Sequence, residues 1–303
     1  MKISAVIEGG MGDMILASRL LAAIKEKHPD SELTVFANNE RNWKFNEFFC
    51  RHWGHLFDDF DGEIDRRGDF FIESQFGREN YRGAIENITD AGLAKINAAD
   101  KVYNLHLDSL AFTRSDLPWA KYARYVPAPR CVASEALPVG TVLVNLFART
   151  GHFSGVSSDY ACSLISALRK IHPVVVIAPS EEAREEFYAP HRDVVRVTSL
   201  SETLSLVSAA DCGVSIDTGV RCMFYSVGKP CLTLCGLAKK PFEIPASHQL
   251  RWYLMPEHIL PVDAKPLFVQ SLISNIIENP ACAAYPQISA RDIDNFLLKR
   301  KYD

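Results

Sequence analysis

The residues with the clearest chemical potential begin with a carboxylate that follows the first apolar run. After residues 2–7 the sequence reads Gly9-Gly10-Met11-Gly12-Asp13, and apolar residues at helical spacing follow at once. The glycines let the backbone turn sharply, and Asp13 stands where the first helix should begin. A carboxylate in that place can accept a proton from an attacking hydroxyl as a general base. The alternative is structural, because an acid in the first turn commonly caps a helix.

This glycine loop lacks the features of a nicotinamide-cofactor site. The dinucleotide pattern needs a third glycine where this chain has Ile15. It also needs an acid after the second strand, where this chain has Asn38 and Asn39. The sequence therefore disfavours an NAD-dependent dehydrogenase.

A second loop, Asp217-Thr218-Gly219, carries residue types that suit a phosphate group. It stands between an apolar run and a helical stretch, so backbone N–H groups and the Thr218 hydroxyl can face an anion. Capping of the following helix is the alternative. Further loops follow other strands of the same half at 149–152, at Ser180 and at 199–201. Parallel strands end at one edge of a sheet, so these loops together predict a phosphate or nucleotide site.

Two other groups imitate metal sites. Asp59-Phe60-Asp61 is an Asp-x-Asp pattern within an acidic run, for which a solvated loop is the favoured interpretation. Cys50, His52 and His55 have the residue types of metal ligands but no second ligand pair at a fixed spacing, so metal binding by them stays open. We predict no metal site and no cofactor.

Alternating strands and helices must position these loops. Apolar, β-branched runs predict strands, which lie at 2–7, 32–37, 70–74, 101–107, 141–147, 173–178, 193–197, 212–216 and 230–236. Helices are expected between them, including one capped by Ser180 and one that Ser201 caps and that ends at Ala210. Two amphipathic helices close the chain near 266–278 and 290–301. This order of elements predicts an α/β fold of doubly wound parallel sheets.

Composition narrows the function classes. The chain has 303 residues, with 33 Lys and Arg against 37 Asp and Glu, and therefore a formal charge of −4. That balance excludes a strongly basic nucleic-acid coat and a polybasic membrane anchor. Eight cysteines follow no disulfide framework, and no apolar window reaches the length of a membrane span. We expect a reduced, cytoplasmic protein without an integral membrane segment.

Two stretches resemble family-9 glycosyltransferases, the heptosyltransferase-like enzymes. MGDMILASRLLAAIKEKHPDSELTVFAN is similar to the N-terminus of that family, and SLSETLSLVSAADCGVSIDTGVRCMFYSVGKPCLTLCG is similar to its donor-binding half. One departure concerns the residues after Asp-Thr-Gly. The family continues Pro-x-His there, and this chain has Val220, Arg221 and Cys222.

The resemblance implies a GT-B architecture, in which two Rossmann-like domains face a cleft. The acceptor-side domain would span 1–130 together with a C-terminal helix at about 285–303, and the nucleotide-sugar domain would span 131–284. Prolines at 127, 129 and 138 mark the boundary between them. The implied reaction is an inverting, metal-independent transfer of a sugar from a nucleoside-diphosphate sugar, which is a co-substrate, to an acceptor hydroxyl on a glycan or a lipopolysaccharide-type molecule.

Each predicted site residue has a role in that reaction. Asp13 is the expected general base, and Gly10, Met11 and Gly12 form the acceptor-side loop. The expected donor-binding residues are Arg149, Thr150, His152, Ser180, Ser199, Leu200, Asp217, Thr218, Gly219, Arg221 and Lys239.

Two alternatives remain from the sequence. One is a GT-B transferase that modifies a protein side chain or a modified DNA base, which is the one role left for nucleic acid as a partner. The other is a nucleotide-sugar-binding protein without catalysis. The donor's base and sugar, the acceptor and the oligomeric state are not readable from the residues.

Overall fold

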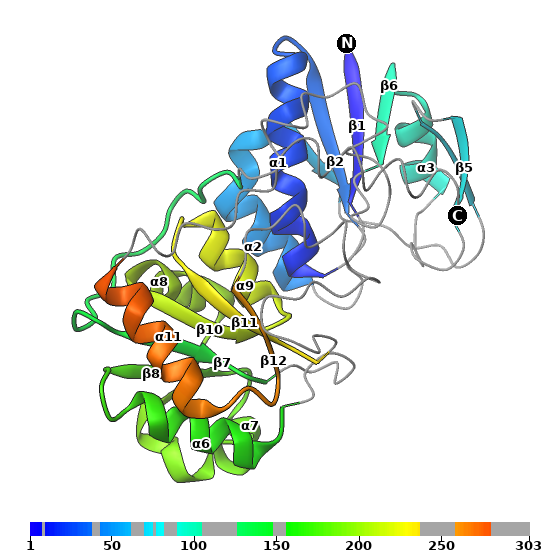
Figure 1. Ribbon diagram of the computed structural model, residues 1–303. Coiled ribbons are helices and arrows are strands. Elements are labelled where there is room, and N and C mark those ends of the chain that lie inside the picture. The colour runs from blue at the N-terminus through cyan, green and yellow to red at the C-terminus, as the bar shows by residue number, and fades with distance from the viewer. Residues whose placement is uncertain are drawn as a thin grey trace, which may run out of the picture. The chain divides into compact units, whose positions relative to one another are not determined.

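The computed structural model describes residues 1–7, 10–37, 43–61, 70–74, 77–81, 90–104, 126–147, 156–236 and 258–279 (Figure 1). They fall into two compact units that divide between Cys131 and Val132. The helix expected at about 285–303 lies outside the described residues, so its place in the acceptor-side domain stays a prediction.

Unit 1 is built on a parallel sheet whose strands follow the order β3-β2-β1-β6. Between β3 and β6, the chain forms an antiparallel hairpin of β4 (Phe70–Ser74) and β5 (Gly77–Tyr81). The sheet strands are β1 (Lys2–Ile7), β2 (Glu32–Ala37), β3 (Asp59–Asp61) and β6 (Lys101–Asn104). The helices are α1 (Met11–Lys27), α2 (Trp43–Trp53), the 3-10 turn η1 (Gly54–Leu56) and α3 (Asp90–Asn97).

The strand order reverses once in this sheet. The chain moves outward from β1 to β2 and β3, and then returns to place β6 on the other side of β1. In open α/β sheets, ligands bind outside the carboxyl ends of the strands at such a reversal. The loop that carries Gly10 and Asp13 follows β1, so unit 1 presents these residues at its reversal point.

Unit 2 is built on a parallel sheet in the order β12-β11-β10-β7-β8-β9. Its strands are β7 (Val142–Asn145), β8 (Val174–Ala178), β9 (Val195–Val197), β10 (Cys212–Ile216), β11 (Cys231–Cys235) and β12 (His258–Pro261). Its helices are α6 (Ser158–Leu168), α7 (Glu181–Glu186), η2 (Ala189–Val194), α8 (Leu200–Ala209), α9 (Gly219–Ser226) and α11 (Pro266–Glu278). The order reverses between β7 and β10, and α9 starts directly after β10.

Alternate residues of the unit 2 strands serve opposite faces of the sheet. Val144, Ile216 and Leu234 belong to one hydrophobic core with side chains of α6 and α11. The intervening residues therefore point to the other face. Because both faces are covered, the inner strands are apolar almost throughout, which is typical of parallel sheets.

Helix α9 lies unusually close to its strand. A Cβ atom built on Gly213 would lie 2.4 Å from the ring of Phe224, so the absence of a side chain is what allows this approach. Phe224 is fully buried, and the close packing around its ring makes any displacement of the ring unfavourable. The contact fixes α9 against β10, and thereby fixes the start of α9 near the reversal point.

The structure confirms the predicted α/β class and corrects two local predictions. Asp59-Phe60-Asp61 is the edge strand β3 rather than a solvated loop, because Phe60 pairs in register with Val35 and Asp61 binds Lys95 at 2.9 Å. Ser199 rather than Ser201 caps α8, since its hydroxyl accepts the Glu202 N–H. Among the described residues, no helix combines the length and the hydropathy that a bilayer crossing needs.

Candidate functional site

The start of α9 is the part of unit 2 best suited to bind an anion. Thr218 is the N-cap residue in an extended conformation (φ −141°, ψ 169°), yet its side chain accepts no hydrogen bond from the first turn. Its hydroxyl instead lies 3.3 Å from the Ser215 hydroxyl, which donates to the Ile216 carbonyl at 2.9 Å. No acid stands in the first turn of α9. Within the described ranges, the N–H groups of Gly219 and Val220 therefore have no side-chain cap, and the helix dipole favours an anion beside them.

A buried ion pair braces this loop. The Arg221 guanidinium lies 2.8 Å from the Asp217 carboxylate, and the two side chains are 0% and 9% exposed. A buried charge is tolerated because its partner compensates it, so each of these residues requires the other. Arg221 was expected to contact the donor. Its full burial beside Asp217 suits a positioning role for the loop.

The three α-helices that precede α9 in unit 2 begin in the opposite way. Each carries a serine N-cap whose hydroxyl accepts a first-turn N–H, and each carries an acid in that turn. The caps and their acids are Ser157 with Asp159 in α6, Ser180 with Glu181 and Glu182 in α7, and Ser199 with Glu202 in α8. A satisfied N–H and a carboxylate both disfavour a phosphate. Two predicted donor residues, Ser180 and Ser199, are therefore helix caps, and Leu200 is the first helical residue after the second cap.

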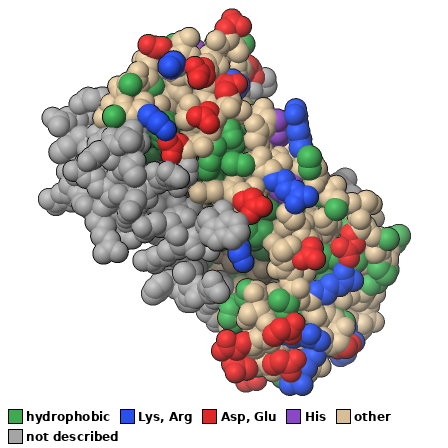
Figure 2. Space-filling view, turned by 180° about the vertical axis from the view of Figure 1, so that it is seen from behind, with side chains coloured by type: hydrophobic (Ala, Val, Ile, Leu, Met, Phe, Trp, Pro, Cys, Tyr) green, Lys and Arg blue, Asp and Glu red, His purple; other side chains and the backbone are tan. Residues whose placement is uncertain are grey.

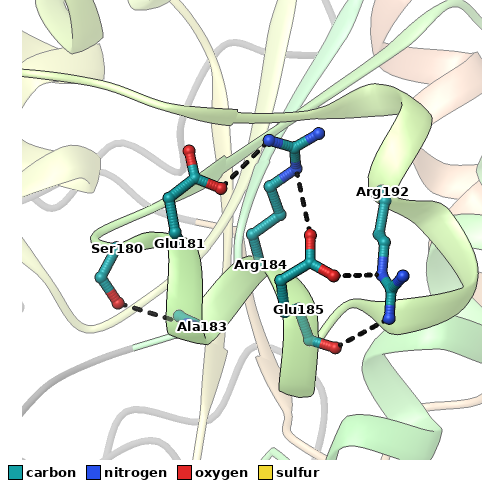
Figure 3. A network of polar contacts seen from close by, with 6 residues as sticks. All are labelled: Ser180, Glu181, Ala183, Arg184, Glu185 and Arg192. Carbon is teal, nitrogen blue, oxygen red and sulfur yellow. Dashed lines mark hydrogen bonds and ion pairs between the residues drawn. The ribbon is translucent and has the colours of Figure 1, made fainter.

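A pocket of about 410 Å³ opens beside the cap of α7. Its lining joins aromatic and small apolar side chains to two acids, namely Phe147, Ser158, Pro179, Ser180, Glu182, Ala183, Glu186 and Phe187. Figure 3 shows how the other two acids of α7 are engaged, with Arg184 beside Glu181 and Arg192 beside Glu185. The pocket therefore combines apolar walls with carboxylates that no described cation pairs. That combination suits a ring bearing hydroxyl or amino groups better than a phosphate.

In unit 1, Asp13 occupies the third position of α1. Its carboxylate accepts the Gly10 N–H at 2.7 Å and the residue is half-buried. Gly10 is the N-cap in an extended conformation, and Met11 is buried below it. This bond is the capping role that the sequence left as the alternative. It also holds the carboxylate at the carboxyl end of β1, where a general base would be placed.

Some predicted residues lie outside the described residues. They are Arg149, Thr150 and His152, which follow β7, and Lys239, which follows β11. Their roles in donor binding stay predictions.

The candidate metal group of Cys50, His52 and His55 lies in α2 and in the 3-10 turn that follows it. Burial raises the pKa of the Cys50 thiol to about 11, which disfavours the thiolate that binds metals. Burial lowers the pKa of His55, which favours its neutral imidazole. His52 Nδ1 lies 2.6 Å from the Arg130 carbonyl oxygen. Within the described ranges, no three His, Cys, Asp or Glu side chains gather as a metal site would need.

One residue at the reversal point was missed by sequence analysis. Asn145 ends β7 and pairs in register with Ser215, and its Oδ1 is buried with no hydrogen-bond partner among the described residues. The only sequence signal was a lone amide inside the apolar run TVLVNLF.

No protein-family model matches the sequence, and no curated protein sequence is similar to it. The fold, in contrast, has counterparts among solved structures. Escherichia coli ADP-heptose lipopolysaccharide heptosyltransferase II superimposes with a TM-score of 0.59 at 14% identity, covering 93% of this chain and 100% of that one. This chain has a heptosyltransferase-like GT-B fold. It comprises two Rossmann-like domains, in agreement with the predicted fold class.

Two further structures share the GT-B fold of this chain. Escherichia coli heptosyltransferase WaaC with ADP-2-deoxy-2-fluoro heptose has a TM-score of 0.53 at 12% identity, covering 90% of this chain and 100% of that one. A family-9 glycosyltransferase from Veillonella parvula DSM 2008 has a TM-score of 0.51 at 13% identity, with 86% and 85% covered. At these identities the likeness concerns the fold, and the site must be argued from the residues of this chain.

Proposed function

We propose that this chain is a glycosyltransferase that moves a sugar from a nucleoside-diphosphate sugar to an acceptor hydroxyl. The observation that supports it best is the start of α9, which has neither a side-chain cap nor a first-turn acid and follows the strand at the reversal point of unit 2. A diphosphate is the group that such a helix end stabilises. The GT-B fold also favours sugar transfer from a nucleotide sugar, but only by analogy with other proteins of this fold.

In this proposal the donor lies along the carboxyl ends of the unit 2 strands. Thr218 and the Gly219 N–H contact the diphosphate, while the Arg221–Asp217 pair holds their loop in shape. The pocket beside Ser180 receives the nucleoside, whose hydroxyl groups can donate to Glu182 or Glu186. The predicted basic residues Arg149 and Lys239, with Thr150 and His152, would complete the anion site.

The proposed reaction inverts the anomeric centre. The acceptor oxygen attacks the anomeric carbon while the bond from that carbon to the diphosphate oxygen breaks, and Asp13 takes the hydroxyl proton. The loop of Gly10, Met11 and Gly12 lies on the acceptor side. The departing diphosphate carries the new negative charge, which the helix N–H groups of α9 and nearby cations stabilise without a metal.

A non-catalytic binding protein is the second candidate. The observation in its favour is the Asp13–Gly10 bond, which shows that Asp13 already has a structural task. The sequence also left two acceptors other than a glycan, namely a protein side chain and a modified DNA base. Figure 2 shows acidic and basic side chains interspersed on the described part of one face, whereas a DNA acceptor favours a basic surface.

The test begins with thermal-shift screening against ADP-, GDP-, UDP-, dTDP- and CMP-sugars. A nucleotide sugar that binds the native state raises the melting temperature by mass action. Slow donor hydrolysis without acceptor then separates an enzyme from a binding protein, and EDTA should leave that hydrolysis unchanged. The proposal is wrong if no nucleotide sugar raises the melting temperature. A strict metal requirement would contradict its metal-independent form.

A further inference from the structure

Three polar side chains form a row across the middle of the unit 2 sheet. Ser215 of β10 pairs in register with Asn145 of β7 on one side and with Thr233 of β11 on the other. Residues in register on neighbouring parallel strands lie about 4.8 Å apart and point to the same face. This row belongs to the face against which α9 packs. It crosses the sheet at the point where the strand order reverses.

The two outer residues of the row, Asn145 and Thr233, each have an unpaired side-chain oxygen. Asn145 Oδ1 and Thr233 Oγ1 are both buried, and neither has a hydrogen-bond partner among the residues that the structure describes. Leaving a buried acceptor unpaired is unfavourable, so each such group in a native protein requires an explanation. The central Ser215 differs from them, because its hydroxyl bonds to Ile216 and lies near Thr218.

Exposure separates the two unpaired residues. Thr233 is 0% exposed and lies under α9, where no ligand can reach it. Asn145 is half-buried and is the last residue of its strand, so it lies at the carboxyl edge of the sheet. An amide both accepts and donates hydrogen bonds, and a hydroxyl group of a ligand can satisfy it. A phosphate can accept but not donate, so it cannot satisfy Oδ1 in this orientation.

We propose that Asn145 is a donor-positioning residue that binds a hydroxyl group of the nucleotide sugar next to the diphosphate at the start of α9. The inference rests on the proposed function. Its strand neighbour Ser215 already contacts the N-cap Thr218, so a hydroxyl on Asn145 lies directly beside the anion site. Two groups of the donor share this chemistry, namely the hydroxyls of the ribose and those of the transferred sugar.

The experiment compares Asn145→Leu with the matched control Thr233→Val. Both changes remove a buried, unpaired oxygen with little change of volume, so both variants should unfold at the same or a higher denaturant concentration than the native chain. Donor affinity is measured by calorimetry with the nucleotide sugar that gave the largest thermal shift, and with its free nucleoside diphosphate. We expect Asn145→Leu to weaken binding by about 5- to 100-fold and Thr233→Val to leave it unchanged.

The two ligands distinguish the two hydroxyl sources. A loss for the nucleotide sugar alone assigns Asn145 to the transferred sugar, and a loss for both ligands assigns it to the ribose. Unchanged binding of both ligands to Asn145→Leu overturns the inference while leaving the proposed function standing. An equal loss of donor affinity in Thr233→Val also overturns the inference, because both changes would then act through the packing of the sheet rather than through a contact with the donor.

A second variant covers the case in which Asn145→Leu does not fold. Asn145→Ser keeps a small polar group that is too short to replace the amide, and its affinity should fall in the same range. Native affinity in folded Asn145→Ser contradicts the inference. If the native chain binds no nucleotide sugar at all, the proposed function fails first, and this result is recognisable before any variant is made.

Discussion

The starts of α1 and α9 occupy the same place in two similar sheets and differ in charge. Each follows a strand at the point where strand order reverses. At α1 the carboxylate of Asp13 caps the Gly10 N–H, so this end is already bonded and negative. At α9 the N-cap Thr218 leaves the first turn uncapped, with Arg221 rather than an acid inside it. In the proposed function, a few residues thus make one topological site a proton acceptor and the other an anion site.

The most severe test of this comparison removes the charge from α1. Asp13→Asn keeps the shape and the capping oxygen but cannot take a proton, so turnover should fall by about 10²–10⁴ while donor affinity holds. Steady-state kinetics and calorimetry measure the two quantities. Glu202→Gln is the matched control, because Glu202 also caps a helix start and should not affect turnover. A fully active but less stable Asp13→Asn would make Asp13 only a cap.

The next test breaks the brace of α9. Arg221→Met leaves the Asp217 carboxylate buried without its partner, and the free energy of unfolding should fall by about 3–5 kcal/mol. Adding Asp217→Asn should restore part of that loss, because the uncompensated charge is then gone. Urea unfolding of both single variants and the double variant measures the coupling. Additive losses would show that the pair does not act as a unit.

A smaller effect is expected from the anion site itself. The double change Thr218→Val with Gly219→Val removes a hydroxyl and blocks the approach to a backbone N–H. Hydrogen bonds to charged groups contribute about 1.5–3 kcal/mol, so donor affinity should weaken by about 10- to 100-fold. Calorimetry on the folded variant measures it. Undiminished affinity would remove the diphosphate from the start of α9.

The smallest effect concerns a capped helix. Ser199→Ala should lower the free energy of unfolding by about 1 kcal/mol. Donor affinity should stay unchanged, because the N–H groups at the start of α8 are bonded to its own cap residues and not to a ligand. The Ser199 N–H bond lowers the pKa of Glu202. The stability that this carboxylate adds is therefore present above the ordinary glutamate pKa and is lost as pH falls through the lowered value. Denaturant unfolding at neutral and acidic pH checks both statements, and a loss of donor affinity would contradict the contrast with α9.

The apolar runs in the sequence, and the turn residues that bound them, predicted the unit 2 sheet well. Each expected strand there is present, because a parallel sheet buried on both faces requires apolar runs that are visible in the sequence. The residues at which helices begin were harder to predict. Ser199 and Ser201 are equally good caps by residue type, and the reciprocal bond with Glu202 decides between them.

The candidate site was predictable only where the chemistry is local. Loops after strands, such as Asp217–Gly219, can be read from their neighbours in the sequence. Asn145 could not be assigned, since its meaning comes from Ser215 on a strand 70 positions later and from an oxygen that nothing satisfies. The burial of Arg221 was likewise invisible, because a charged side chain in a helix normally predicts a solvent-facing position.

The close contact between Gly213 and Phe224 has a consequence for how variation in this protein should be interpreted. Even alanine at position 213 would place a methyl group within 2.4 Å of a buried ring, so α9 would have to tilt or slide. Because the opposite end of that short helix carries Thr218, the displacement would emerge as a binding defect. A saturation scan scored on ligand affinity would then list Gly213 beside true contact residues. In more distant relatives, a glycine two positions before the hydroxyl of β10 would be a better marker of a retained site than Asp-Thr-Gly, which ordinary turns also contain.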